Sequence, residues 1–246
     1  MDWSRAKTIF IISFILLDLF LAAQVNQMIE QKSNYLKTDE FSEEQIRELL
    51  EAHQIQITTK IPDDTTQTPA LKAAITPVFN WDYNEKWIYQ YSFATPVPIN
   101  NRSKLQDYLK KKLPFFHEYH YSKEYSTQDK QVFLQYYHQH PIFDGKIVCY
   151  LKNGKMTNIQ ALHFQIKERV NIEFVSFKQA LFNFIKRNSL PKGTKITNIE
   201  LGFRSMYYPS PQEVILVPVW RFTVNNKQHY YIYATTKNLN ENTAWK

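Results

Sequence analysis

The chain of 246 residues is poor in glycine and cysteine, with four glycines and one cysteine. So few glycines leave little room for a phosphate-binding loop, in which glycines let backbone N–H groups approach a phosphate. With Cys149 alone, no intrachain disulfide can form. The Gly-x-Ser-x-Gly motif of serine hydrolases is also missing. These absences exclude a disulfide scaffold and argue against a nucleotide-binding or hydrolytic enzyme.

Aromatic residues are abundant, with 16 Tyr, 17 Phe and 5 Trp, and hydrophobic residues make up 43% of the chain. This composition predicts a folded, β-rich protein with an aromatic core. The net charge of +7 would give weak attraction to an anionic cell wall or lipid surface, although solubility alone also accounts for it. No nucleic-acid-binding motif is present, so we expect no nucleic-acid partner.

One apolar run, residues 9–25, is interrupted only by Ser13, Asp18 and Gln24. As a helix it would be roughly 25 Å long, enough to cross a slightly thinned membrane. Basic residues precede it, which predicts an N-terminus inside the cell. We expect a cytoplasmic stub (1–8), an uncleaved transmembrane anchor (9–28) and an extracellular remainder. A cleaved signal peptide is the alternative, but residues 22–26 offer no clear cleavage pattern.

Asp18 lies in the middle of this apolar run, where a charged side chain costs about 2.5–3.5 kcal/mol on insertion scales. It belongs to a series at steps of four and three, which is typical of a helix–helix seam. The series predicts a contact with another transmembrane helix, and its small alanine would allow close approach. The alternative is an acid that an apolar helix tolerates. The predicted contact residues are Ile11, Ile15, Asp18, Ala22 and Val25.

After the anchor, the periodicity predicts an α+β fold of antiparallel sheets with packed helices. Capping boxes predict helices beginning at Ser42, Ser103 and Ser176. Asn153-Gly154 suits a type I′ turn and predicts a hairpin. Segment 62–80 resembles a surface loop, and 86–93 a central strand. The expected strands cover 54–61, 86–93, 116–125, 131–138, 146–151, 155–166, 195–208, 213–224 and 228–235.

Helix followed by strands occurs twice, around 103–166 and 176–235, which suggests two similar extracellular subdomains, 29–170 and 171–246. No catalytic constellation is found in either. A metal site that combines His117 or His120 with His138 or His140 is conceivable, but these residues are equally well explained as histidines on the surface of strands. Cys149, in an apolar strand, is expected to be a buried thiol. We therefore assign no catalytic residue, metal or cofactor. The four histidines are His117, His120, His138 and His140.

The N-terminus MDWSRAKTIFII (1–12), followed by LLDLFL (16–21), closely resembles that of YycI proteins. Looser similarity covers FDGKIVCYLKNGK (143–155) and VPVWRF with YYIYA (217–222 and 230–234). YycI proteins are auxiliary membrane proteins of the WalK/WalR (YycG/YycF) two-component system in low-GC Gram-positive bacteria. The last strand pair also looks like that of PepSY-type domains, although Trp220 is as readily explained as a core residue.

The resemblance implies a single-pass membrane protein with its N-terminus in the cytoplasm and its C-terminal portion outside. It implies two partners, a YycH-like protein and the sensor histidine kinase, and a role in tuning kinase activity and hence cell-wall metabolism. Asp18 would then be a helix–helix contact in a membrane complex. The alternative function is an extracellular binding module for anionic cell-wall polymer. An enzyme is the third class, and it would require polar side chains that converge in a pocket.

Overall fold

The computed structural model describes residues 43–62, 67–99, 101–206 and 210–235, together with six separate positions near the N-terminus: Trp3, Phe14, Leu17, Asp18, Leu21 and Gln24. The chain divides into two compact units, 1–46 and 47–246. The fold described below is that of the second unit. Among the described residues, no helix has the length and apolar character needed to cross a membrane. Most of the predicted anchor, 9–28, lies outside the described residues.

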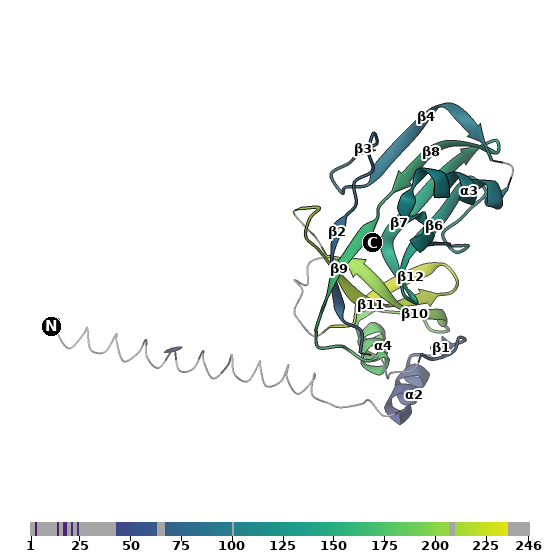
Figure 1. The fold of residues 1–246 in the computed structure, drawn as a ribbon. Helices are drawn as coiled ribbons and strands as arrows, with labels where there is room; N and C mark the ends of the chain where they lie inside the picture. Colours follow the sequence, from purple (N-terminus) through teal and green to yellow (C-terminus); the bar gives the residue numbers. More distant parts are fainter. Residues whose placement is uncertain are drawn as a thin grey trace. The chain divides into compact units, whose positions relative to one another are not determined.

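Within the described part of the chain, twelve strands form one hydrogen-bonded sheet (Figure 1). Its main path runs in the order β3-β4-β8-β7-β10-β11-β2-β9, while β6 pairs with β7 and β5, β12 with β11, and β1 with β10. The strands are β1 (Gln56–Ile57), β2 (Ala70–Ile75), β3 (Asp82–Tyr83), β4 (Tyr89–Pro98), β5 (Tyr119–Tyr121), β6 (Lys130–Tyr137), β7 (His140–Lys152), β8 (Lys155–Ala161), β9 (Phe164–Val170), β10 (Lys195–Ser205), β11 (Val214–Val224) and β12 (Gln228–Tyr233).

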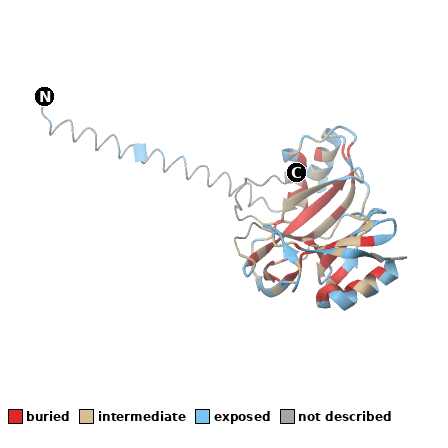
Figure 2. Ribbon diagram, turned by 90° about the horizontal axis from the view of Figure 1, so that it is seen from above, coloured by how far each residue is buried: buried red, intermediate tan, exposed pale blue. Residues whose placement is uncertain are grey.

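The sheet has two parts, which meet where β7 runs parallel to β10. The first part holds β3 to β8, and α3 (Arg102–Lys112) buries Leu105 and Leu109 against it. The second part holds β1, β2 and β9 to β12. There α4 (Phe177–Arg187) stacks Phe184 on Phe222 of β11 with ring centroids 4.6 Å apart. Figure 2 shows buried residues along the strands and exposed residues on the outer sides of the helices.

Two of the predicted helix starts can be compared with the structure. Ser176 caps α4 as predicted, because its hydroxyl accepts a hydrogen bond from the Gln179 N–H at 3.3 Å. In α3 the predicted cap, Ser103, is wrong by two residues. Asn101 caps the helix instead, since its side-chain oxygen accepts from the Lys104 N–H at 2.9 Å. The first of the three predicted helices corresponds to α2, which spans Glu43–Ala52. Its predicted cap, Ser42, lies outside the described residues.

The predicted hairpin is confirmed. β7 and β8 join at Asn153 and Gly154, which both have positive φ (52° and 72°), as a type I′ turn requires. The expected single strand over 155–166 is wrong, because β8 ends at Ala161 and β9 begins at Phe164 and pairs with β2. Residues 116–118 are not a strand either. They belong to the 3₁₀ helix η1 (Pro114–Glu118), which has proline at its first turn.

The predicted surface loop 62–80 is also wrong, because it contains β2, with Leu71 fully buried between β9 and β11. Its sequence, ALKAAI, is dominated by alanine, which is depleted in strands, and Lys72 is its one exposed residue, so the strand signal is weak. β4 is not central. It lies second from the edge beside the two-residue β3, which pairs only with Tyr89 and Gln90, and most of its side chains are exposed.

The predicted subdomain division at 170/171 stays a prediction. Strand pairing crosses that position in the chain, since β2 pairs with β11 and β1 pairs with β10. Segments that precede residue 171 therefore contribute strands to the second part of the sheet. The sheet is mixed, because β10 runs parallel to both β1 and β7 while the other pairings are antiparallel.

The close approach of β7 and β10 depends on Gly202. A Cβ atom there would lie 2.5 Å from the Pro141 carbonyl oxygen and 2.6 Å from the Phe143 ring. We expect Gly202→Ala to lower the free energy of unfolding by about 1–3 kcal/mol, because the crowded backbone must move. Urea unfolding followed by tryptophan fluorescence would measure this. Lys195→Ala, at an exposed position of the same strand, is the control. Equal stability of the two variants would contradict the prediction.

Candidate functional site

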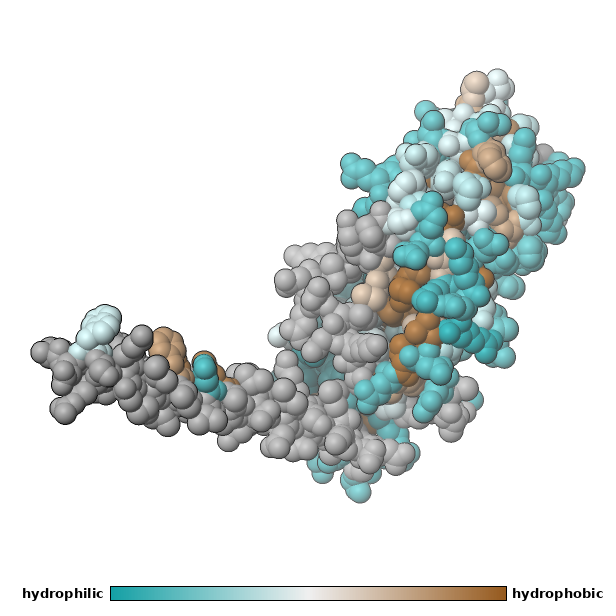
Figure 3. Space-filling model, turned by 60° about the vertical axis from the view of Figure 1, so that its left-hand side comes forward, coloured by the Kyte–Doolittle hydropathy of each residue, from teal (hydrophilic) through white to brown (hydrophobic). Residues whose placement is uncertain are grey.

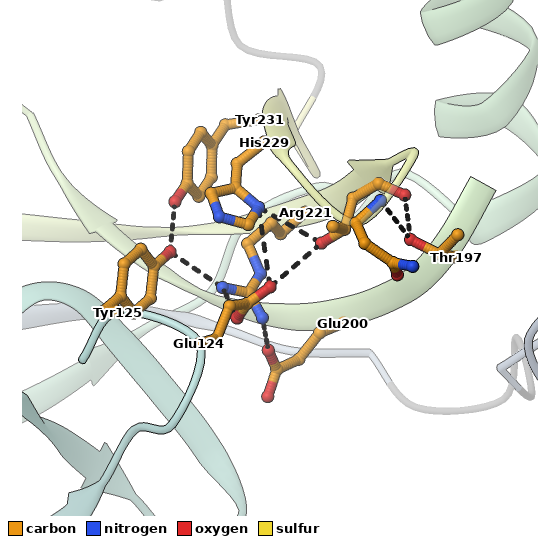
Figure 4. Close-up of polar contacts among 9 residues, drawn as sticks. Glu124, Tyr125, Thr197, Glu200, Arg221, His229 and Tyr231 are labelled. Carbon is orange, nitrogen blue, oxygen red and sulfur yellow. Dashed lines mark hydrogen bonds and ion pairs between the residues drawn. The ribbon is translucent and has the colours of Figure 1, made fainter. Parts of the chain in front are cut away.

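A buried arginine, Arg221 of β11, forms the centre of a polar network between the two parts of the sheet (Figure 4). Its side chain is only 3% exposed. One terminal nitrogen donates to the Tyr125 hydroxyl at 2.8 Å and lies 2.7 Å from Glu124, and the other donates to Glu200 at 2.6 Å. Glu124 and Tyr125 belong to the connection 122–129 between β5 and β6, whereas Glu200 is on β10.

These partners determine the charge states in the network. Burial opposes the charge on Arg221, but Tyr125, Glu200 and Glu124 outweigh it, so the pKa of Arg221 lies above its usual value. Burial raises the pKa of Glu200 even though Arg221 opposes this. In β12, burial raises the pKa of Tyr231, whose hydroxyl lies 2.9 Å from that of Tyr125.

A second ion pair lies beside this network and joins β7 to β10. Arg204 donates to Asp144 at 3.1 Å, and the Ser205 backbone N–H donates to the same carboxylate at 2.9 Å. The Arg204 guanidinium also lies over the Tyr231 ring, 4.5 Å from its centroid. Because both arginines bond groups from other segments of the sheet, the arrangement holds these segments together, although the buried Nε of Arg221 has no hydrogen-bond partner among the described residues. On the same side of Arg221, the Thr223 hydroxyl lies 3.2 Å from His229 Nδ1, which in turn lies 3.7 Å from Glu124.

Replacing Arg221 should therefore destabilise the fold. Arg221→Met leaves Glu124 and Glu200 without their shared cation. Since both carboxylates keep partial exposure, we expect the low end of the usual cost of breaking a buried pair, about 3 kcal/mol. Lys72→Met is the matched control, because it breaks the half-exposed pair with Glu168 and should change stability little. Chemical unfolding would compare the two, and a similar loss in both would contradict a special role for Arg221.

A groove of about 810 Å³ lies beside the first part of the sheet and also includes residues next to β2 and in β9. It is the best candidate for a binding site in the described residues. Its walls come from the segment after β2, from β4, and from α3 with η1. On the face of the molecule shown in Figure 3, the described hydrophobic side chains lie in small groups among hydrophilic ones. The residues lining the groove are Thr76, Pro77, Val78, Phe79, Asn80, Trp81, Tyr91, Phe93, Tyr108, Lys112, Pro114, Phe115, His117, Glu118, Ile159, His163 and Gln165.

One buried histidine, His163, organises the polar part of the groove. Its Nδ1 lies 2.7 Å from the Thr76 hydroxyl, and its Nε2 lies 3.0 Å from Glu118. Burial lowers the pKa of His163, although Glu118 opposes this, so the ring is neutral at pH 7. A neutral ring has one N–H. Because Glu118 is a hydrogen-bond acceptor, the N–H is at Nε2 and donates to Glu118, and Nδ1 accepts a hydrogen bond from the Thr76 hydroxyl. Gln135 donates to the same Glu118 oxygen at 2.8 Å.

The structure describes only some of the residues that the sequence singled out as candidate site residues. Asp18 is helical and exposed, whereas the other four seam residues, Ile11, Ile15, Ala22 and Val25, lie outside the described residues. The predicted transmembrane contact therefore stays a prediction. Cys149 is fully buried, and burial raises the pKa of its thiol to about 12, which makes it inert. Trp220 is a core residue, because its indole N–H donates to the Val175 carbonyl at 3.1 Å and its ring packs on Phe177.

The four histidines considered as metal ligands have separate partners. His117 bonds the Pro114 carbonyl, His138 contacts Arg169, His140 bonds the Leu201 carbonyl, and His120 packs on the Tyr136 ring. Throughout the described ranges, no group of three or more His, Cys, Asp or Glu side chains is arranged to hold a metal ion.

Sequence reasoning missed both Arg221 and His163. Arg221 is the one charge in the apolar strand VILVPVWRFTV, and a lone charge in such a strand is a usable signal of a buried ion pair. No such signal identifies its partners, which lie 21 and 97 positions earlier in the chain. His163 occupies the break between β8 and β9, which was expected to be continuous strand.

The titration of His163 gives a pH prediction. Burial lowers its pKa in the folded chain below the ordinary value of 6.5, so the unfolded chain takes up this proton first as the pH falls. The free energy of unfolding should therefore decrease as pH falls from about 7.5 to about 5.5. His163→Gln should show a shallower decrease over that range, with His229, whose pKa burial also lowers, accounting for part of the remainder. Urea unfolding at several pH values would test this, and an unchanged slope in His163→Gln would refute it.

Comparisons with known proteins place the chain in a family. The model of the family described as "YycI protein" matches residues 33–235. No curated protein matches the chain. Among solved structures, an uncharacterised protein from Eubacterium rectale is similar over 73% of this chain and 87% of its own, with 9% identity and a TM-score of 0.38. The Bacillus megaterium YpeB C-terminal domain is similar over 80% and 94%, with 13% identity and a TM-score of 0.37.

Proposed function

Because the chain belongs to the YycI family, we propose that it tunes a sensor histidine kinase of the WalK type without catalysing a reaction itself. The family is regulatory and non-enzymatic, and it is associated with the WalK system. The match over residues 33–235 is the observation that carries the proposal. The ion pairs of Arg221 and Arg204 support it, since they join neighbouring strands and so serve the fold.

In this proposal the protein is a single-pass membrane protein, with residues 1–8 in the cytoplasm, 9–28 in the membrane and the remainder outside. The seam around Asp18 contacts a transmembrane helix of the kinase, and a YycH-like protein is the second partner. A regulator changes kinase activity only if it binds two arrangements of the kinase with different affinity. A polar contact in lipid suits this role, because a shift of the helices would leave the carboxyl group without its partner.

The test is recovery of the kinase with the tagged full-length protein after gentle solubilisation. We expect mass spectrometry to identify a sensor histidine kinase and a YycH-like protein. Asp18→Leu should reduce kinase recovery several-fold, because it removes the polar contact. Gln24→Leu is the matched control, since it also replaces a polar residue of the apolar run but lies off the seam.

The outcomes separate the parts of the proposal. Equal recovery with Asp18→Leu and Gln24→Leu would remove the transmembrane contact and assign kinase binding to the outer portion. Absence of a kinase from every sample would overturn the regulator proposal. Salt-dependent binding of the protein to anionic wall polymer would then favour the binding-module alternative, which the net charge of +7 supports.

A further inference from the structure

We propose that the groove beside β4 and α3 is a saccharide-binding site for a short oligosaccharide. The inference does not depend on kinase regulation, since it concerns a ligand of the isolated chain. Two observations carry it: exposed aromatic rings on the walls, and polar side chains that have no partner within the described residues.

Aromatic rings follow one another along the groove. Trp81 and Tyr91 stack with ring centroids 5.7 Å apart, Tyr91 meets Phe93 edge-on at 5.0 Å, and Phe93 meets Tyr108 at 6.0 Å. Tyr91 is 41% exposed, and Phe79 is 86% exposed in the turn closed by the Trp81 N–H and the Val78 carbonyl. A contiguous group of exposed apolar side chains, unlike a single exposed ring, often marks a ligand or partner site. Their flat faces fit the C–H face of a sugar ring.

Polar side chains lie among these rings and are open to a ligand. One Glu118 oxygen accepts from His163 and Gln135, whereas the other makes no hydrogen bond to a described residue. Five further lining residues carry polar groups for which no hydrogen bond to another described side chain is found: Tyr91, Tyr108, Trp81, Lys112 and Gln165. The site therefore offers both donors and acceptors beside apolar faces.

This combination favours a saccharide over the two other occupants of an aromatic groove. An apolar peptide segment would cover the Glu118 oxygen and the tyrosine hydroxyls without bonding them, which costs free energy. A cationic ligand would suit Glu118 and the rings, but Lys112 would repel it. A sugar has an apolar face and a rim of hydroxyls that donate and accept. The volume of about 810 Å³ lies in the usual range for small-molecule sites and exceeds that needed for one sugar ring.

His163 and Thr76 position the acceptor. Because Thr76 donates to Nδ1, the ring presents its N–H to Glu118 and fixes one carboxylate oxygen, so the other oxygen keeps one orientation toward a ligand. Phe115 stacks on His163 with centroids 4.1 Å apart and holds the ring in place. A fixed acceptor loses little conformational entropy on binding.

The experiment is a tryptophan-fluorescence titration of the full-length protein in phospholipid nanodiscs. Alkyl glycoside detergents are avoided, because their sugar head groups would compete. The probes are the tetrasaccharides of β-1,4-linked N-acetylglucosamine and of β-1,4-linked glucose, together with a neutral tetrapeptide of leucine and phenylalanine. We expect saturable binding of at least one saccharide and none of the peptide.

Three variants locate the site. Tyr91→Ala and Phe79→Ala replace exposed rings, so the fold should persist, and each should weaken saccharide binding by about tenfold, as for a stacked aromatic anchor. Tyr150→Ala is the matched control, because it removes an equally accessible tyrosine outside the groove. No saturation by either saccharide up to about 10 mM would overturn the proposal, since such affinity is negligible. Equal weakening in Tyr150→Ala, or saturation by the peptide alone, would overturn it as well.

Discussion

The buried charge of Arg221 is the interaction on which the two-part sheet depends. Taking a guanidinium out of water costs several kcal/mol unless good partners replace the solvent. Glu200 on β10 belongs to the same part of the sheet as Arg221, whereas Glu124 comes from the connection after β5, so the charge has both partners only when both parts of the sheet are in place. Direct pairing of β7 with β10 is limited to the register Ile142 with Phe203. The ion pairs therefore provide orientation that the short ladder cannot.

Local signals in the sequence predicted local structure well. The Ser176 cap and the Asn153-Gly154 hairpin were predicted because each depends on interactions within a few residues. The mixed α+β class followed from the same signals. β2 was missed because its burial comes from β9 and β11, which lie about a hundred or more positions later. For the same reason, the sequence indicated a lone charge at Arg221 but not the residues that neutralise it. The groove also assembles from distant segments, which no spacing in the sequence predicts.

The family match and the most specific sequence resemblance fall on different parts of the chain. The closely similar residues lie in 1–21, whereas the family model matches 33–235, where similarity to quoted motifs was looser. Residues 47–235 form an aromatic-rich sheet. Buried positions of such a core tolerate exchange among apolar side chains of similar volume, so no short motif within it is specific. The short apolar run with one acid at the N-terminus, by contrast, is a specific pattern that can be recognised from the sequence alone. The function proposed for residues 9–28 and the fold of residues 47–235 are thus supported by different evidence.

The short edge strand β3 has a consequence for how the protein behaves at high concentration. β3 covers only Tyr89 and Gln90, so the outer edge of β4 beyond them has no strand beside it among the described residues. Such an edge can recruit a strand from another molecule and start aggregation. Pro96 and Pro98 lack backbone N–H groups and therefore interrupt the ladder that an incoming strand would need. The two prolines thus oppose the addition of a strand at this edge of the sheet.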